Sequence, residues 1–390
     1  MEHYHGLVLN LHQPTRNLED LWENQPWEAK DILYALDRIP RTLWAFEDVA
    51  RVHLAMSGTL LETLANRQFQ DLVYNTIKCG DLLWFLQNEK IIQILGNAYY
   101  HPVLPLIPSK DREEHLLRWI GLAKHIFFRN YFPGFWPPEM GFCMEMIPLL
   151  KHFGYQYVLV DCEHVEPLHP MKWEELRYRP HIARYGQDEI IVVVRDRDLS
   201  KAQESGMNYE WFAHELQERT QWCDFPSLVV TCTDGENGEW FRNAANSANF
   251  WNSFYLEFLN NVRLGTAPAK PIFIHEYINQ HGWWGEVRVH SGSWNTGEHS
   301  GIGFVQWTGS EAQKDALRRI HDTSATLYYL KEVLGDKLQD PHRQYQMEEA
   351  MWHLLKAETS CYLYWGESWV YRVHKDLDTV WFNLDELRKN

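Results

Sequence analysis

The sequence predicts an α/β fold, a (β/α)7 barrel distorted from the usual TIM type and followed by a helical subdomain. Over residues 6–234, short apolar runs alternate with stretches of helical periodicity, which indicates repeated strand–helix units and a parallel sheet. Seven such units in one domain favour closure into a barrel. From Glu311 onward apolar residues recur at helical spacing without further strand signals.

The seven predicted strands share one property, which is that polar residues follow each of them directly. They are residues 6–11, 52–56, 91–95, 135–136, 157–160, 190–194 and 228–231. Barrel enzymes carry their chemistry at the carboxyl ends of the strands. His12, Glu139, Asp161 and Asp234 all stand at or just after such ends, so we expect them at one face of the barrel. Residues 272–275 are either an eighth strand or a strand outside the barrel.

Helices are predicted between the strands and after them. In the first part of the chain they include residues 60–72, a helix opened by an Asp111–Glu114 capping box, and residues 246–262. We expect a barrel domain over residues 1–309, with a Trp- and Gly-rich loop at 276–309 that is too long for a plain connection. We expect the helical subdomain, packed on the barrel, over residues 310–390. Its helices are predicted at 312–334, ended by Gly335, at 344–357 and at 376–388.

The composition excludes some partners and favours another. The net charge is -16 and no Lys/Arg cluster offsets it, so we expect neither nucleic acid nor a membrane surface as a partner. The 19 tryptophans offer flat apolar faces that suit sugar rings, although any one of them is more often a core residue. The six cysteines show no CxxC spacing, and we predict a cytoplasmic protein without signal peptide or membrane span. The oligomeric state stays open.

Two carboxylates carry the functional interpretation. Glu139 follows Trp136 and two prolines that stiffen the backbone, which favours a directed nucleophile over a surface loop residue. Asp234 ends an apolar run, although Asp-Gly is also the commonest turn dipeptide. Glu236 is close enough to be the acid instead, or to support it. Two such acids are what glycoside hydrolysis needs.

The remaining motifs are weaker. His12 could bind a sugar hydroxyl or be an ordinary loop histidine. Histidines at positions 3, 5 and 12 raise the possibility of a metal, but there is no HExxH, HxxxH or cysteine pair. No P-loop and no GxGxxG occur. We therefore predict no metal and no other cofactor.

In order along the chain, several segments resemble the motifs of glycoside hydrolase family 57. They are His12-Gln13-Pro14, Tyr99-Tyr100-His101-Pro102, Trp136-Pro137-Pro138-Glu139, Asp234-Gly235-Glu236-Asn237, Ser291-Gly292-Ser293-Trp294 with Trp307, and Ala357-Glu358-Thr359-Ser360 through Trp365. The resemblance implies a (β/α)7 barrel with a helical region and a retaining mechanism on α-linked glucans. It also implies that Glu139 is the nucleophile, that Asp234 is the acid/base, and that no metal takes part.

We expect an oligo- or polysaccharide substrate bound by residues near these motifs. The candidates are His12, Gln13, His101, Trp136, Asp161, Glu236, Trp240, Trp283, Trp294 and Trp365. The family commonly has an aspartate near the position of Cys361, and its absence here leaves the subsites open. Hydrolysis, transfer and branching are not distinguished. The alternatives are a non-catalytic carbohydrate-binding or regulatory protein on the same fold, or a metal-dependent carbohydrate hydrolase or deacetylase.

Overall fold

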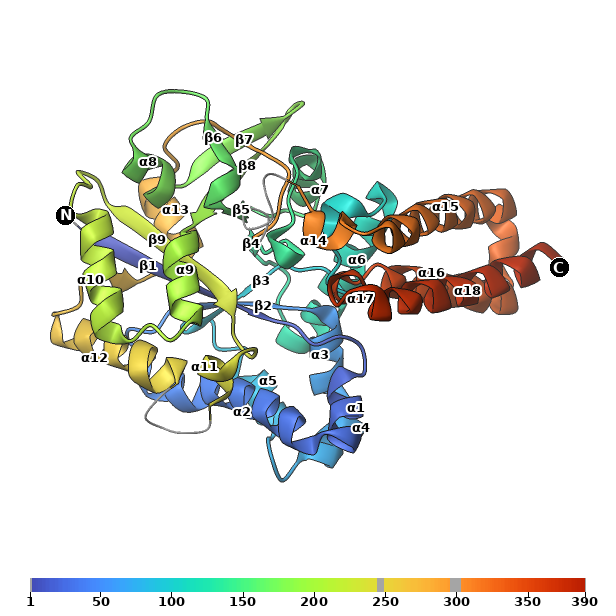
Figure 1. Ribbon diagram of the computed structural model, residues 1–390, viewed down its shortest axis with the longest axis horizontal. Coiled ribbons are helices and arrows are strands. Elements are labelled where there is room, and N and C mark those ends of the chain that lie inside the picture. The colour runs from blue at the N-terminus through green and yellow to red at the C-terminus, as the bar shows by residue number, and fades with distance from the viewer. Residues whose placement is uncertain (1, 244–248, 295–302, 390) are drawn as a thin grey trace.

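Seven parallel strands form a nearly closed ring in the computed structural model, which describes residues 2–243, 249–294 and 303–389 (Figure 1). The ring strands are β1 (His3–Leu11), β2 (Val52–Met56), β3 (Ile92–Leu95), β4 (Gly134–Phe135), β5 (Tyr157–Asp161), β8 (Asp188–Arg195) and β9 (Ser227–Asp234). They match the seven predicted strands, and the predicted barrel fold is confirmed.

The ring closes through backbone contacts between β3 and β4. Gly96, directly after β3, accepts a hydrogen bond from the Trp136 N–H at 2.9 Å and donates one to the Gly134 carbonyl at 2.8 Å. A Cβ at Gly96 would lie 2.2 Å from the Tyr155 ring, which explains the glycine at this seam. The β8–β9 contact is also short, with a single register pair between Arg195 and Val230. These short contacts distort the barrel.

The predicted strand at residues 272–275 is wrong. The sheet pairing in this region belongs to β10 (Lys270–Pro271), which lies parallel to β1 outside the ring, at Tyr4 and His5. Residues from Ile274 onward form helix α13 (Ile274–His281), whose buried Ile274, Tyr277 and Ile278 recur at helical spacing. The apolar run at residues 272–274 resembles a strand because it is too short to show whether its apolar residues repeat with helical or strand spacing.

Helices surround the ring. They are α1 (Asn17–Asn24), α2 (Pro26–Leu43), α3 (Gly58–Ala65), α4 (Arg67–Val73), α5 (Cys79–Phe85), α6 (Ser109–Phe127), α7 (Ile147–His152), α8 (Trp173–Tyr178), α9 (Arg197–Glu204), α10 (Tyr209–Thr220), α11 (Glu239–Arg242) and α12 (Leu256–Leu264). The predicted helix at 60–72 is two helices, because the Asn66 side chain accepts the Phe69 N–H and starts a new one.

Two further predicted helix starts need correction. The capping box at Asp111 is absent, because α6 already begins at Ser109 after Pro108 and buries Asp111 in its first turn. Before α12 lies a π-helical turn, Trp251–Tyr255. The first residues of the predicted helix at 246–262 fall within 244–248, outside the described residues.

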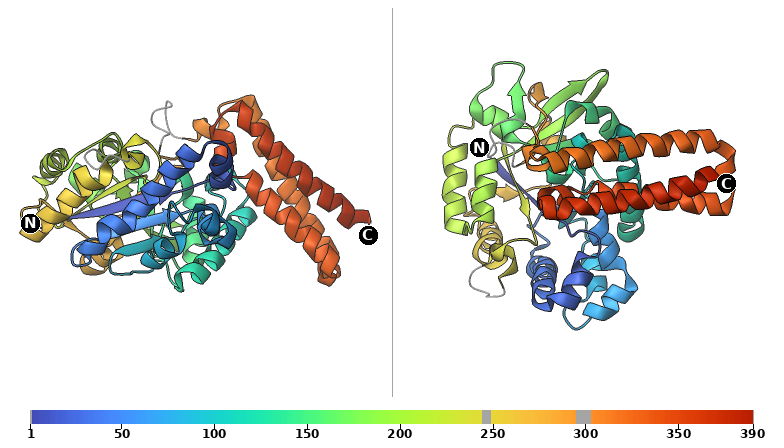
Figure 2. Two further views of the ribbon diagram at one scale, coloured as in Figure 1. Left: turned by 90° about the horizontal axis from the view of Figure 1, so that it is seen from below. Right: turned by 45° about the vertical axis from the view of Figure 1, so that its right-hand side comes forward.

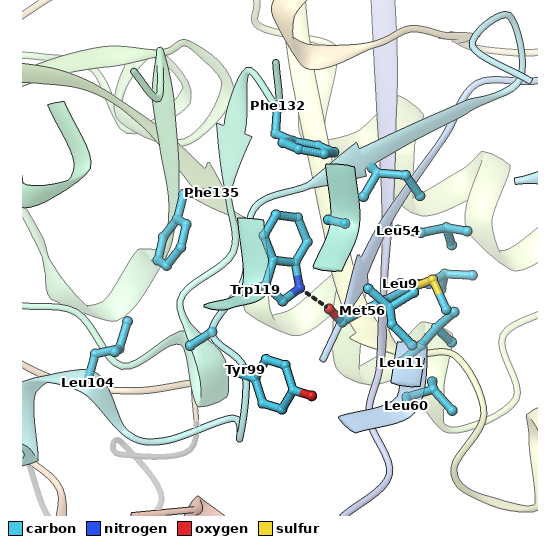
Figure 3. Packing of buried hydrophobic residues seen from close by; sticks show 14 of the residues in the cluster. Leu9, Leu11, Leu54, Met56, Leu60, Tyr99, Leu104, Trp119, Phe132 and Phe135 are labelled. Atoms are coloured by element: carbon cyan, nitrogen blue, oxygen red, sulfur yellow. Dashed lines mark hydrogen bonds between the residues drawn. The ribbon is translucent and has the colours of Figure 1, made fainter. Parts of the chain in front are cut away.

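Buried apolar side chains occupy both faces of the barrel wall. Inside the ring, Val8, Leu95, Leu159 and Val230 pack with Trp136. Outside it, Trp119 of α6 donates its indole N–H to the Met56 carbonyl at 2.7 Å, among Leu9, Leu11, Leu54, Leu60, Tyr99, Leu104, Phe132 and Phe135 (Figure 3). This packing fixes α6 against the strands that lead to the site.

The region predicted as a loop at 276–309 is partly regular structure. After α13, strand β11 (Val287–Val289) pairs antiparallel with β6 (Val165–Pro167), and α14 spans Val305–Thr308. A further strand, β7 (His181–Tyr185), lies antiparallel to β8 outside the ring. Residues 295–302 lie outside the described residues.

The chain ends in the predicted helical region. Its helices are α15 (Glu311–Leu334), α16 (Pro341–Ala357), α17 (Ser360–Tyr364) and α18 (Glu367–Lys389). The first of these is capped by Gly335, as predicted. Helices α15, α16 and α18 run side by side and project away from the barrel (Figures 1 and 2). The division into two domains at residue 309 stays a prediction. Over the described residues, no helix combines the length and the apolar character needed to cross a membrane.

Candidate active site

A cavity of about 620 Å³ lies where the ends of β1, β8 and β9 meet the helical region. Both predicted catalytic carboxyls line it, together with Asn10, His12, Gln13, Pro14, Asn17, Leu21, Glu28, Ile32, His101, Arg195, Lys201, Glu204, Asn237, Gly238, Arg242, Trp294, Cys361, Tyr364, Trp365 and Trp369. Its lining mixes charged, amide and aromatic side chains, which suits a polar ligand with apolar faces.

Glu139 sits on an unusual backbone turn. After Pro137 and Pro138 the chain turns left-handed at Glu139, with φ 56° and ψ 17°, and again at Met140, with φ 49°. Two consecutive non-glycine residues in this region carry conformational strain, which clusters at functional sites. Hydrogen bonds hold the turn, since the Met140 N–H donates to the Pro137 carbonyl at 2.8 Å and the Trp294 N–H to the Glu139 carbonyl at 3.1 Å.

The Glu139 carboxyl is held by two donors. The Ser360 hydroxyl donates to Oε1 at 2.7 Å, and the Trp294 indole N–H donates to Oε2 at 3.0 Å. Burial raises the pKa of Glu139 to about 7, and the charge of Asp234 adds to this, while the two hydrogen bonds oppose it. The carboxyl therefore changes its protonation near neutral pH, where acid–base chemistry at a glycosidic bond operates.

Asp234 ends β9 beside the end of β1. Its Oδ1 accepts a hydrogen bond from the Asn10 side-chain amide at 2.9 Å, and the two residues are register partners in the sheet. Its Oδ2 lies 3.5 Å from the Asn237 amide nitrogen. Burial raises the pKa of Asp234 also. The parallel sheet thus fixes the second carboxyl through a neighbouring strand.

Two histidines stack at the wall of the cavity. The rings of His12 and His101 are 4.0 Å apart and nearly parallel. Burial lowers the pKa of His12 to about 3, so its ring is neutral at physiological pH. Nε2 of His12 lies 3.4 Å from the Cys361 sulfur, and Nε2 of His101 lies 3.3 Å from Asn10 Oδ1. The pair offers neutral hydrogen-bonding groups to a ligand.

Glu236 and Asp161, both predicted to bind ligand, are buried and are not among the residues that line the cavity. Glu236 Oε1 accepts the His12 backbone N–H at 2.7 Å and the Gln13 side-chain amide at 3.3 Å. Burial, with the charge of Asp234, raises the pKa of Glu236 to about 8. Its contacts place it behind the His12–Gln13 segment, which it holds in position.

Asp161 forms ion pairs with two arginines. Its carboxylate contacts Arg195 Nη1 at 2.6 Å and Arg197 Nε at 3.0 Å. Arg195 also donates from Nε to the Cys232 carbonyl at 3.0 Å, and its guanidinium lies 5.6 Å from the centroid of the Trp294 ring. Asp161 therefore orients Arg195, and it is Arg195 that reaches the cavity.

The five predicted ligand-binding tryptophans separate into two groups. Trp294 and Trp365 line the cavity. Trp136 is fully buried inside the barrel, where it packs edge-on against Trp294 at 5.5 Å. Trp240 packs against the core, and Trp283 is 45% exposed; neither lines the cavity. Trp240 and Trp283 were predicted from residue type alone, and Trp136 from its place in the motif before Glu139. Neither signal gives the direction of a side chain.

Sequence reasoning missed several cavity residues. They include Asn10, Arg195, Arg242 and Trp369. Ser360, which was not predicted as a site residue either, does not line the cavity but donates to Glu139. Arg242 donates to the Asn237 side-chain oxygen at 2.7 Å and to the Glu236 carbonyl at 2.8 Å, so it braces the segment after Asp234. Asn10 is the second-last residue of a predicted strand and Arg195 directly follows another, and these positions were a usable signal.

The segment that carries Ser360 is fixed from behind. The Ser360 N–H donates to the His101 carbonyl at 3.1 Å. Two residues earlier, Glu358 is buried and accepts a hydrogen bond from His115 Nε2 at 3.0 Å. Burial and the charge of Asp111 raise the pKa of Glu358 well above its usual value. Helix α6 thereby anchors the start of α17.

Among the side chains that the structure places, no group of three or more His, Cys, Asp or Glu residues is arranged to hold a metal ion.

Comparison with known proteins identifies the family of this chain and agrees with its fold. Residues 6–286 match the model of Glycosyl hydrolase family 57. An alpha-amylase of Pyrococcus furiosus is 29% identical over 197 residues, which cover 49% of this chain but only 26% of the amylase. The chain thus matches about a quarter of the length of this curated relative.

Two solved structures share the fold over nearly the whole chain. One is a branching enzyme from Thermococcus kodakaraensis, with a TM-score of 0.74 and 14% identity, covering 100% of this chain and 90% of that one. The other is an alpha-amylase from Thermotoga maritima, also with a TM-score of 0.74 and 14% identity, covering 99% and 94%. With the family match spanning residues 6–286, these findings lead to one conclusion: the chain belongs to glycosyl hydrolase family 57.

Proposed function

We propose that the protein is a retaining hydrolase or glucanotransferase acting on α-linked glucans. The observation that carries the proposal is the pair of Glu139 and Asp234, two buried carboxyls with raised pKa values that line one cavity. Family membership supports it, and so do relatives that are an alpha-amylase and a branching enzyme.

In the first step, Glu139 attacks the anomeric carbon and forms a bond to it, while the glycosidic C–O bond breaks. Asp234 gives its proton to the departing oxygen, which leaves as a hydroxyl. The hydrogen bonds from Ser360 and Trp294 aim the Glu139 carboxylate and stabilise its charge before attack.

In the second step, Asp234 acts as a base. It takes a proton from water or from a sugar hydroxyl, whose oxygen then replaces Glu139 on the anomeric carbon. The configuration is retained after two inversions. The Asn10 and Asn237 contacts keep Asp234 oriented through both proton transfers.

The substrate is proposed to lie against the aromatic and polar lining of the cavity. Trp294, Tyr364, Trp365 and Trp369 would stack on sugar rings, while His12, Gln13, His101 and Arg195 would bind hydroxyls. We also propose a cytoplasmic location, because the six cysteines are free thiols and five of them are buried.

Product analysis on maltooligosaccharides and amylose tests the proposal. Wild type should shorten, disproportionate or branch these glucans with retained anomeric configuration, seen by NMR of the first products. Glu139→Gln and Asp234→Asn should each reduce turnover by about 10²-fold or more. If both variants turn over at the wild-type rate, the catalytic assignment is wrong. A wild type that binds oligosaccharides without any turnover would instead indicate a non-catalytic binding protein.

A further inference from the structure

We propose that a second groove, lined by Trp44, Tyr74 and Trp84, binds an α-glucan chain independently of the active site. The ligand class rests on the proposed function, while the groove itself rests on its own geometry. Its volume is about 960 Å³. Besides these three residues, its lining includes Asp37, Arg41, Asn75, Lys78 and Asp81.

The groove belongs to a different part of the barrel from the active site. Trp44 opens the 3₁₀ turn Trp44–Phe46 after α2, in the segment that leads into β2. Trp84 lies near the end of α5, in the segment that leads into β3. These segments precede the amino ends of their strands, whereas the catalytic residues follow the carboxyl ends. No residue lines both the groove and the active-site cavity among the described residues.

Large aromatic surfaces are exposed together here. Trp44 and Trp84 are each 61% exposed and Tyr74 is 60% exposed. The ring centroids of Trp44 and Trp84 are 5.8 Å apart with the planes tilted by 36°, so the two indoles form one continuous surface. Exposing that much contiguous aromatic area to water is unfavourable, and such patches mark interaction sites.

The polar surroundings favour a neutral, hydroxyl-rich ligand. Two acidic residues, Asp37 and Asp81, and two basic residues, Arg41 and Lys78, line the groove with the Asn75 amide. Arg41 is paired with Asp37, and the Lys78 ammonium lies 5.7 Å from the Tyr74 ring centroid. The formal charges balance, which gives no attraction for a polyanion. Flat rings beside paired donors and acceptors match sugar units, which have apolar faces and hydroxyl edges.

The active-site cavity contains the same arrangement. Trp365 and Trp369, which line it, have ring centroids 6.4 Å apart and planes tilted by 45°. A pair of adjacent, tilted tryptophans therefore occurs both at the catalytic centre and at the groove. A polymer held at the groove would keep its other segments near the same protein molecule, which raises their local concentration at the cavity.

The test separates polymer binding from turnover of short substrates. The double variant Trp44→Ala/Trp84→Ala is compared with wild type by retardation in native gels containing glycogen, and by turnover of maltotetraose. We expect glycogen binding to weaken about tenfold, since each stacking contact contributes a moderate part. Maltotetraose turnover should stay at the wild-type level. Trp222→Ala, which removes a 72% exposed tryptophan outside the groove, is the matched control and should change neither readout.

Trp44→Phe/Trp84→Phe keeps aromatic faces and should bind glycogen with intermediate strength, which guards against misfolding of the alanine variant. Unchanged glycogen retardation in the alanine variant overturns the proposal, as does a wild type that glycogen does not retard. A loss of self-association in the same variant, with retardation unchanged, would identify a protein–protein interface instead. If wild type shows groove-dependent retardation without turnover, the proposed catalysis fails while the groove stands.

Discussion

Ser360 donates a hydrogen bond of 2.7 Å to Glu139, across 221 residues of sequence. The acceptor sits on the turn after β4, and the donor begins α17 in the helical region. The contact joins the two parts of the chain at the carboxyl proposed as nucleophile. It also lowers the pKa of Glu139 against the larger effect of burial.

Ser360→Ala should shift the pH profile of the enzyme upward. The hydroxyl stabilises the Glu139 carboxylate, so its removal raises the pKa of that group further above 7. Since attack requires the carboxylate, kcat/KM should fall about tenfold at pH 6 and less at pH 8. Ser360→Thr, which keeps a hydroxyl, is the control. If the alanine variant is folded and the acid limb of its pH profile is not shifted, Ser360 does not stabilise the Glu139 carboxylate.

Asp234→Asn should shift the acid limb of the pH profile to lower pH. The negative charge of Asp234 raises the pKa of Glu139, and the amide removes that charge. Turnover of maltooligosaccharides should drop by about 10²–10⁴-fold, because the leaving oxygen is no longer protonated. Maltosyl fluoride, whose leaving group needs no proton, should still form the covalent intermediate. Equal losses on both substrates would argue against the acid role.

Glu139→Gln should stabilise the fold at alkaline pH. The folded-state pKa of Glu139, about 7, lies above the ordinary value of 4.5, so the neutral form is favoured by folding. The contribution of Glu139 to the free energy of unfolding is therefore fully present below about pH 4.5 and is lost as the pH rises through 7. At pH 8 the variant should therefore exceed wild type in unfolding free energy by roughly 1–3 kcal/mol, and at pH 4.5 the difference should vanish. Denaturant titrations at both pH values measure it, and a pH-independent difference would refute the linkage.

Glu358→Gln should be tolerated where Glu358→Ala is not. Burial and the charge of Asp111 raise the pKa of this carboxyl and so favour its neutral form, which an amide mimics in shape and charge. Alanine leaves the buried His115 Nε2 without its partner, which costs about 1–3 kcal/mol of unfolding free energy. Urea denaturation at pH 7 compares the two variants. Equal destabilisation by glutamine and alanine would show that Glu358 is charged in the folded protein.

The strands were predictable because each apolar run ends in a polar residue, and this pattern also located Glu139 and Asp234. The same pattern also predicted Asp161 as a ligand-binding residue, whereas its side chain lies in the wall, because a polar side chain at a strand end can point into the cavity or away from it. Sequence periodicity over three or four residues does not separate these directions. The direction of the Asp161 side chain is set by its ion pairs with Arg195 and Arg197, which lie more than thirty positions away in the sequence.

The contributions of the helical region were harder to foresee. Ser360 and Trp369 lie in amphipathic segments whose apolar faces are expected to pack on one another. Their approach to Glu139 depends on the backbone contact between Ser360 and His101 and on the anchoring of Glu358 by His115, both of which are long-range. Tertiary contacts of this kind leave no local signal.

Helix α17 and the residue after it supply Cys361 and Trp365 to the cavity and Ser360 to Glu139, although both carboxyls are synthesised much earlier in the chain. While the chain is still bound to the ribosome and these residues have not emerged, Glu139 lacks its Ser360 donor and the cavity lacks one wall. Under the proposed function, a fragment that ends before residue 360 should therefore assemble its strands and yet be inactive on glucans, because the segment that completes the site is missing.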